Sequence, residues 1–354
     1  MKALCVTLFA GFAAALAGCS AAPTQVVLPL TGTAEIHLEV EDHVHSGGWM
    51  RPDAKSMDLL YVSDNDKLLV FSYPKGRLVG EIGVASGDFT GLCSDSAGDV
   101  FVTSLGSSFQ GYVLEYAHGG TEPIATLNDP GRPNGCAIDP TTGSVAVTNE
   151  SADDPPYDHG DVVIFPNGHG PPAAYFDSSV GYFSFCSYDA TGDLFADGDG
   201  YITELPAGGQ MLSNITLDKS IGPSSIQWVD AYHAFVVADF SGGPNGPNYI
   251  YRVHISGSTG TVSGPTILKT KRDRSSRDVQ FWTGDGRIIG PGLIRGNPGL
   301  LDFWRYPRGG WPTKIIHRPD GALDLYGVAV SRASARSSET HSPAKSAGGL
   351  VGQR

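Results

Sequence analysis

Short apolar segments alternate with turns rich in glycine, proline and asparagine along most of the chain, and no long stripe of helical period interrupts them. One pattern occurs six times: an apolar or aromatic strand, a Pro/Gly turn and a second apolar strand. The six copies are VFSYPKGRLVGEI from Val70, VLEYAHGGTEPIATL from Val113, VVIFPNGHGPPAAYF from Val162, ITELPAGGQMLSNITL from Ile202, IYRVHISGSTGTVSGPTIL from Ile250 and LDFWRYPRGGWPTKII from Leu301. Their turn glycines are Gly76, Gly119, Gly168, Gly208, Gly257 and Gly309. Self-similarity at a period of about 40–50 residues indicates one supersecondary unit copied in tandem.

The second copy shows most clearly that each unit holds four strands. Its strand segments are residues 91–95, 99–103, 112–116 and 123–127, and a short turn at 96–98 joins the first two. A tandem array of four-stranded units of this length is typical of a β-propeller, in which each unit forms one blade. The sequence therefore predicts an all-β fold, a six-bladed β-propeller with four-stranded antiparallel blades.

The first copy lacks its first strand, because it begins with the second-strand segment LLYVSD at residues 59–64. The segment LYGVAVS at residues 325–331 has the character of a first strand. We therefore expect this C-terminal strand to complete the first blade and close the ring, which leaves no open seam. A competing interpretation makes residues 49–51 that first strand, and an extra strand pair near residues 34–40 would add irregularity.

The N-terminus has the features of a targeting segment. Lys2 precedes an apolar stretch, residues 3–15, that is too short to span a bilayer. The stretch leads into LAGCS at residues 16–20, which resembles the lipobox of bacterial lipoproteins. In that family the peptidase cuts before the cysteine, here Cys19, whose thiol carries a diacylglyceryl group. The alternative is an ordinary secretory signal that contains a cysteine.

The lipobox resemblance implies a domain order and a location. Residues 1–18 are the expected signal peptide, residues 19–48 a lipidated Cys19 with its tether, residues 49–331 the propeller, and residues 332–354 a disordered tail poor in bulky apolar side chains. Ser20 after the cysteine resembles the outer-membrane sorting pattern. We therefore expect a lipid-anchored protein of the outer membrane, facing the periplasm or the cell surface, with the bilayer as a partner of its acyl chains.

Composition excludes one class of partner. The formal net charge is −13 at pH 7, so the chain lacks the basic surface that displaces counterions from nucleic-acid phosphates. The one basic cluster, residues 271–277, alternates with aspartates and is expected to be a solvated loop. We therefore predict no nucleic-acid partner.

Three cysteines remain once Cys5 is cleaved off and Cys19 is lipidated. Cys136 and Cys186 occupy equivalent places in successive repeats, and Cys93 is offset by one residue. They are interpreted as small apolar side chains packed between blades. A Cys136–Cys186 disulfide in an oxidising periplasm is the alternative, whereas spacing without a CxxC pair makes a poor zinc site.

The blades, over roughly residues 49–331, resemble bacterial NHL-repeat and six-bladed propeller proteins, including uncharacterised exported proteins of soil bacteria. One stretch also resembles the gluconolactonase-type propellers: RPNG at residues 132–135, Asp139-Pro140, and VTN at residues 147–149. Those propellers hold a divalent cation in the central channel through one Glu, two Asn and one Asp from different blades. The resemblance implies a Ca²⁺ ligand role for Asn134, although the matching position in repeat five, GPSS at residues 222–225, offers no amide or carboxylate.

Other polar side chains follow second strands, which places them on the same channel rim as Asn134. The candidate rim residues are Asn134, Asn149, Glu150, Asp197, Asp199 and Asp239. Asp197-Gly198-Asp199-Gly200 lacks the remaining ligands of a calcium loop and is interpreted as a hairpin turn.

The predicted function is a membrane-anchored binding or scaffold module for an unidentified protein, peptide or glycan. A divalent-metal-dependent hydrolase similar to the lactonases is the first alternative. A lyase similar to the streptogramin lyases is the second, because Glu150 and His159 share one acidic loop. No serine or cysteine has the sequence context of a catalytic triad.

Overall fold

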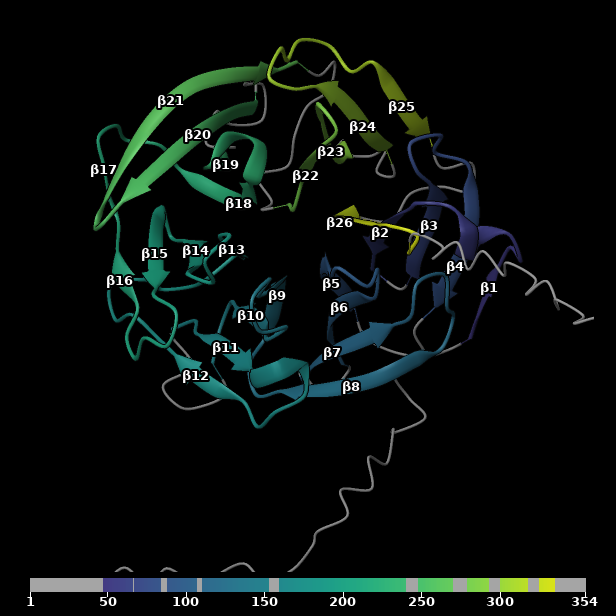
Figure 1. Ribbon diagram of the computed structural model, residues 1–354, viewed down its shortest axis with the longest axis horizontal. Helices are drawn as coiled ribbons and strands as arrows, with labels where there is room; N and C mark the ends of the chain where they lie inside the picture. Colours follow the sequence, from purple (N-terminus) through teal and green to yellow (C-terminus); the bar gives the residue numbers. More distant parts are fainter. Residues whose placement is uncertain are drawn as a thin grey trace, which may run out of the picture. The chain divides into compact units, whose positions relative to one another are not determined.

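The computed structural model describes residues 47–65, 67–83, 88–106, 110–152, 159–239, 248–269, 279–292, 300–317 and 325–334. These residues form six sheets arranged as the blades of a ring (Figure 1). The prediction of an all-β, six-bladed propeller is confirmed. The expected signal peptide, Cys19, the tether with residues 34–40, the basic cluster and residues 335–354 all lie outside the described residues.

Blades one to three each run from an innermost strand at the channel to an outer strand at the periphery (Figure 1). Blade one consists of β26 (Leu325–Ser331), β2 (Leu59–Asp64), β3 (Lys67–Ser72), β4 (Leu78–Gly83) and β1 (Gly48–Met50). Blade two consists of β5 (Asp88–Ser94), β6 (Val100–Leu105), β7 (Gly111–Tyr116) and β8 (Pro123–Asp129). Blade three consists of β9 (Pro133–Ile138), β10 (Val145–Asn149), β11 (Val162–Phe165) and β12 (Ala173–Tyr175).

Blades four to six repeat this order. Blade four consists of β13 (Phe185–Tyr188), β14 (Leu194–Gly198), β15 (Tyr201–Leu205) and β16 (Ser213–Asn214). Blade five consists of β18 (Pro223–Val229), β19 (Ala234–Asp239), β20 (Asn248–Ser256), β21 (Thr259–Leu268) and β17 (Thr216–Leu217), which joins the outer edge in parallel. Blade six consists of β22 (Trp282–Gly284), β23 (Arg287–Gly292), β24 (Leu300–Arg305) and β25 (Lys314–His317). Three 3-10 helices in the described ranges are η1 (Ala54–Ser56), η2 (Pro166–Gly168) and η3 (Asp230–Tyr232).

The turn between the third and fourth strands explains the repeated glycine. All six turn glycines have positive φ, from 55° at Gly257 to 83° at Gly168. Residues with a Cβ rarely adopt this backbone conformation, so the turn selects glycine in every blade. The repeat in the sequence therefore reflects a repeated hairpin geometry.

The C-terminal strand closes the ring as expected. β26 pairs antiparallel with β2, with Leu60 opposite Val330 and Val62 opposite Val328. The competing interpretation of residues 49–51 is wrong, because β1 pairs with β4 at the outer edge of blade one. A strand from each end of the chain thus contributes to one sheet.

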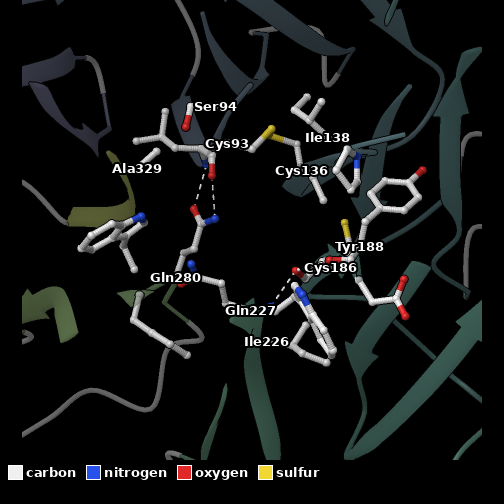
Figure 2. A pocket seen from close by; sticks show the side chains of 18 of the residues that line it. Cys93, Ser94, Cys136, Ile138, Cys186, Tyr188, Ile226, Gln227, Gln280 and Ala329 are labelled. Atoms are coloured by element: carbon white, nitrogen blue, oxygen red, sulfur yellow. Dashed lines mark hydrogen bonds between the residues drawn. A yellow bond between two sulfur atoms is a disulfide. The ribbon is translucent and has the colours of Figure 1, made fainter. Parts of the chain in front are cut away.

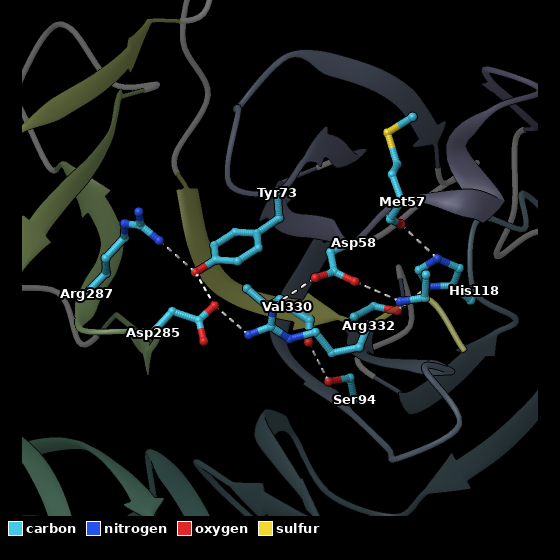
Figure 3. A network of polar contacts seen from close by, with 11 residues as sticks. Met57, Asp58, Tyr73, Ser94, His118, Asp285, Arg287, Val330 and Arg332 are labelled. Carbon is cyan, nitrogen blue, oxygen red and sulfur yellow. Dashed lines mark hydrogen bonds and ion pairs between the residues drawn. The ribbon is translucent and has the colours of Figure 1, made fainter. Parts of the chain in front are cut away.

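The propeller also extends past its expected end at residue 331. Arg332 forms salt bridges with Asp58 at 2.8 Å and with Asp285 at 2.7 Å (Figure 3). Its guanidinium lies 5.0 Å from the ring centroid of Tyr73 and 5.8 Å from that of Trp282. Arg332 therefore connects blade one to blade six, and the expectation that the tail begins at this residue is corrected.

The core is divided among the blade interfaces. The buried apolar side chains form six clusters in the described part of the chain, one between each pair of neighbouring blades. In β2, Leu59 and Tyr61 pack toward blade two while Leu60 and Val62 pack toward blade six. Because side chains alternate along a strand, a strand buried on both faces is apolar throughout.

One polar contact recurs between neighbouring blades. A hydroxyl near the end of a second strand accepts a hydrogen bond from its own inner strand and donates one to the inner strand of the next blade. Thr148 accepts from the Gly135 N–H at 3.1 Å and donates to the Ser184 carbonyl at 2.8 Å. Ser63 and Thr103 make the equivalent pairs of bonds in blades one and two. These hydroxyls satisfy buried backbone groups that no strand partner reaches.

Candidate functional site

A cavity of about 540 Å³ lies in the channel at the centre of the ring (Figure 2). All six blades line it, through Ser94, Ile138, Tyr188, Trp228, Trp282 and Ala329 among others. In blades one to five these residues lie in the later part of the innermost strand, whereas Trp282 of blade six begins β22. Pro140, Ala190 and Asp230 also line the cavity and are exposed, so it opens to solvent on the face where the innermost strands end.

Two glutamine side chains hold the wall of this cavity together. The Gln280 amide donates to the Leu92 carbonyl at 2.6 Å and accepts from the Leu92 N–H at 2.8 Å (Figure 2). The Gln280 backbone N–H donates to the Tyr326 carbonyl at 2.9 Å, so one residue of blade six ties blades one and two. Gln227 of blade five forms the same pair of bonds with Thr283 of blade six, at 3.0 and 2.6 Å.

Gly327 in β26 leaves room for the Gln280 bridge. A Cβ at Gly327 would lie 2.9 Å from Gln280 Oε1 and 2.8 Å from the Thr90 carbonyl oxygen. Both distances are shorter than van der Waals contact, so a larger residue would displace the bridging amide. Glycine at this position therefore shapes the channel wall.

The cavity combines aromatic rings with carboxylates. The Trp228 indole N–H donates to Asp230 at 2.5 Å, which fixes the ring at the mouth. Asp189 accepts bonds from the Thr191 N–H at 2.8 Å and hydroxyl at 2.9 Å. Among the described residues that line the cavity, none is a Lys, Arg or His. Carboxylates and aromatic faces both attract positive charge, so the cavity favours a cationic ligand.

The cysteines depart from the interpretation of all three as small apolar side chains. Cys93 of β5 pairs with Cys136 of β9, with their Cα atoms 5.6 Å apart, and Cys186 is a buried free thiol. All three cysteines line the cavity (Figure 2). The alternative of a Cys136–Cys186 disulfide is therefore wrong, and the interpretation as a small apolar side chain holds for Cys186 but not for Cys93 and Cys136. Burial raises the pKa of the Cys186 thiol, so it stays protonated and behaves as a small apolar side chain.

Strand alternation explains this pairing. Cys136 packs against blade two and Cys186 packs against blade three, so each faces the preceding blade. Equivalent positions in a ring of blades all face the same way and therefore do not meet. Cys93 is offset by one residue and faces blade three, where it meets Cys136.

The six rim residues expected from the sequence lie on the opposite face, where the innermost strands begin. Strand pairing places Asn149 opposite Pro133 and Asp197 opposite Phe185. Asn134 is the second residue of β9, about 13 Å along the strand from Ile138 at the cavity. Their role in binding stays a prediction, and the cavity lies at the other end of the channel.

The exposed rim candidates have ordinary surface environments. Glu150 forms an ion pair with Arg132 at 3.2 Å, and both side chains are about half exposed. Asp199 and Gly200 have φ values of 48° and 81°, as a two-residue hairpin turn requires. The interpretation of DGDG as a hairpin turn is confirmed. His159 is exposed.

Asp197 and Asp239 are buried in structural positions. Asp197 accepts a hydrogen bond from the Phe185 N–H at 3.1 Å and occupies the position that Thr148 has in blade three. Asp239 accepts one from the Gly222 N–H at 3.1 Å. Asp197 therefore binds the inner strand of its own blade, and Asp239 binds the residue just before its inner strand.

Asn149 forms a buried cluster with two residues that the sequence analysis did not select. Its amide nitrogen donates to Asp129 at 3.1 Å and to Asp161 at 2.8 Å. We call these three residues the Asp129–Asn149–Asp161 cluster; their exposed fractions are 1%, 0% and 5%. Burial, with a smaller contribution from the nearby Asp161 carboxylate, raises the pKa of Asp129 to about 6. The sequence signal was weak, because Asp129 belongs to the preceding blade.

The described residues were also compared with the expectations of a metal site and of a membrane anchor. Within the described ranges, no group of three or more His, Cys, Asp or Glu side chains gathers in a way that could hold a metal ion. In the same part of the chain, none of the helices has the length and apolar character needed to cross a membrane.

No protein-family model matches the chain, and no curated protein matches its sequence. Among solved structures, it is similar to a chain in the crystal structure of a nidogen/laminin complex, with a TM-score of 0.58 and 12% identity over 78% of this chain and 100% of that one. It is also similar to a protein of unknown function from Bacteroides caccae, with a TM-score of 0.56 and 11% identity over 78% and 99% of the two chains. A virginiamycin B lyase from Staphylococcus aureus aligns with a TM-score of 0.46 and 13% identity over 81% and 95%. At these identities the first two likenesses show the propeller fold alone.

Proposed function

We propose that this chain is a lipid-anchored, extracytoplasmic binding module that captures its ligand in the channel cavity. The observation that carries the proposal is the cavity of about 540 Å³, to which every blade contributes wall residues. This volume is within the range of small-molecule pockets in proteins, which span roughly 300–1,000 Å³. It accommodates a small molecule or one or two side chains of a peptide.

The location rests on two separate features. The LAGCS sequence ending the N-terminal apolar stretch resembles a lipobox, and acylation at Cys19 would hold the propeller at a bilayer. The Cys93–Cys136 disulfide suits an oxidising compartment. Both features favour a location outside the cytoplasm. The proposal of the outer membrane in particular depends on Ser20 alone.

The chemistry of the lining favours a ligand with a positively charged group. Asp189 and Asp230 bring negative charge to the cavity, and the ring of Trp228 offers a face for a cation. Each aspartate already accepts a hydrogen bond that holds its position. A lysine or arginine side chain of a peptide fits this environment better than an anion does.

Tryptophan fluorescence tests the proposal, with trilysine as the cationic probe and maltotriose as a neutral one. We expect saturable quenching by trilysine, weakened at least fivefold in Asp230→Asn and by added salt. Asp199→Asn removes one charge from the opposite face and is the matched control, expected to bind as the wild type does. Equal binding in both variants, or no binding of trilysine, would exclude the cavity as a cation-selective site.

The metal-dependent hydrolase remains the alternative function. It predicts hydrolysis of a lactone panel in the presence of Ca²⁺, lost in Asn134→Ala. Binding of trilysine without any lactone hydrolysis would favour the binding module.

A further inference from the structure

The Asp129–Asn149–Asp161 cluster brings two carboxylates from different blades to one buried point. Asp129 ends β8 of blade two, whereas Asn149 and Asp161 flank a loop of blade three. One amide nitrogen lies 3.1 Å from an Asp129 oxygen and 2.8 Å from an Asp161 oxygen. The two carboxylate oxygens therefore lie within about 6 Å of each other. Two ionised carboxylates at this distance in a buried place repel each other, and a cation between them would remove that repulsion.

Two buried oxygen atoms of this cluster lack hydrogen-bond partners among the described residues. They are Asp129 Oδ2 and Asn149 Oδ1. Asp129 and Asn149 are at least 99% buried, so bulk water does not solvate these atoms freely. A buried acceptor without a donor is costly, and such atoms in a folded protein call for an explanation. Both are oxygen atoms of the kind that bind hard cations.

The backbone around the cluster is held in place. The Gly131 N–H donates to Asp129 at 2.8 Å, and the Asn149 N–H donates to the Asp161 carbonyl at 2.9 Å. A Cβ on Gly131 would lie 2.5 Å from the Asn149 side-chain amide carbon, so the glycine permits the amide to sit here. Turning that amide by 180° exchanges its nitrogen for its oxygen, which brings the amide oxygen next to the two carboxylate oxygens and leaves the nitrogen in the present place of Oδ1.

We propose that Asp129, Asn149 and Asp161 form a divalent-cation site, suited to Ca²⁺, at the junction of blades two and three. Ca²⁺ accepts carboxylate and amide oxygens at 2.3–2.6 Å in flexible geometry, with water completing its shell. The ion neutralises both carboxylates and joins the two blades. The site is separate from the channel cavity and independent of the proposed ligand.

Calcium titration of the EDTA-treated, full-length protein tests this site. We expect one bound Ca²⁺ per chain and a rise in Tm of about 5 °C at a hundredfold excess over Kd. Asp129→Asn and Asp161→Asn remove ligand charge and should weaken binding at least tenfold. Asp239→Asn, a buried aspartate on the same face, is the matched control and should bind as the wild type does.

Asn149→Asp should change Ca²⁺ binding in the opposite direction to the two aspartate substitutions. Its third carboxylate should lower Tm in EDTA and strengthen Ca²⁺ binding at least tenfold. Wild-type protein whose Tm and calcium content do not respond to Ca²⁺ overturns the proposal, even if every variant fails to fold. Equal loss of binding in Asp239→Asn and Asp129→Asn also overturns it.

Discussion

The hydroxyl of Thr148 donates a 2.8 Å hydrogen bond to the carbonyl of Ser184 and thereby joins blade three to blade four. The same oxygen accepts the Gly135 N–H at 3.1 Å, so one buried atom satisfies groups on two inner strands. Thr148→Val keeps the shape and removes both bonds, and we expect a loss of about 1–3 kcal/mol in the free energy of unfolding. Urea denaturation measures it.

Thr261→Val is the control for this substitution. Thr261 lies in strand β21 with its side chain exposed, so the same chemical change should alter stability by less than about 0.5 kcal/mol. Equal effects of the two substitutions on the free energy of unfolding would show that the Thr148 hydroxyl does not stabilise the contact between blades three and four.

Arg332 should contribute to ring closure, because its guanidinium contacts Asp58 of blade one and Asp285 of blade six. Hydrogen bonding to Arg332 lowers the pKa of Asp285. These side chains are partly exposed, so each pair contributes modestly. We expect Arg332→Ala to lower the free energy of unfolding by about 1–2 kcal/mol. Arg308→Ala removes an exposed arginine of blade six and should be neutral; a neutral Arg332→Ala would contradict the role of this bridge.

The disulfide should be visible by peptide mapping. We expect native protein to yield a Cys93–Cys136 cross-linked peptide, and Cys186 to react with iodoacetamide only after unfolding, because it is buried. Reduction, or Cys93→Ser, should cost about 2–4 kcal/mol of stability. A Cys136–Cys186 peptide would show that the blade faces are assigned wrongly.

Asp129 should make stability depend on pH when calcium is chelated. Its pKa rises from an ordinary value of 3.8 to about 6 in the folded state. Between these values the folded state holds a proton that the unfolded chain releases, so the free energy of unfolding falls as pH rises, by about 3 kcal/mol in all. Above pH 6 this loss is complete. The difference between wild type and Asp129→Asn, measured in EDTA from pH 4 to 7.5, isolates the effect, and a constant difference would refute the shifted pKa.

The fold was predictable because one hairpin geometry recurs. Each copy repeats a glycine at the turn between its third and fourth strands, so the sequence marks the same position in every blade. The role of residues 325–331 was also predictable, because the first copy has one strand fewer than the others. A blade without its inner strand would leave an open seam in the ring. The alternative Cys136–Cys186 pairing was wrong because it took equivalence between repeats as proximity. In a ring, equivalent side chains face the same neighbour, and the offset residue Cys93 is the one that reaches Cys136.

The candidate sites were less predictable for a physical reason. Residues such as Gln227 and Gln280 act through bonds to other blades, at sequence separations of 56 and 188 residues. The Asp129–Asn149–Asp161 cluster likewise joins two blades, and its members Asp129 and Asn149 are separated by 20 residues in the sequence. Strand topology predicted which face each candidate occupies. Which end of the channel is hollow depends on side-chain packing, which the repeat pattern does not encode.

Hydrogen–deuterium exchange of the protein with and without saturating trilysine tests the channel cavity most directly. We expect slower exchange in the segments at the cavity, residues 186–190 and 226–230, and unchanged exchange in residues 129–134 and 148–152 on the opposite face. Slowing confined to residues 129–134 and 148–152 would place the ligand on the rim instead and contradict the account.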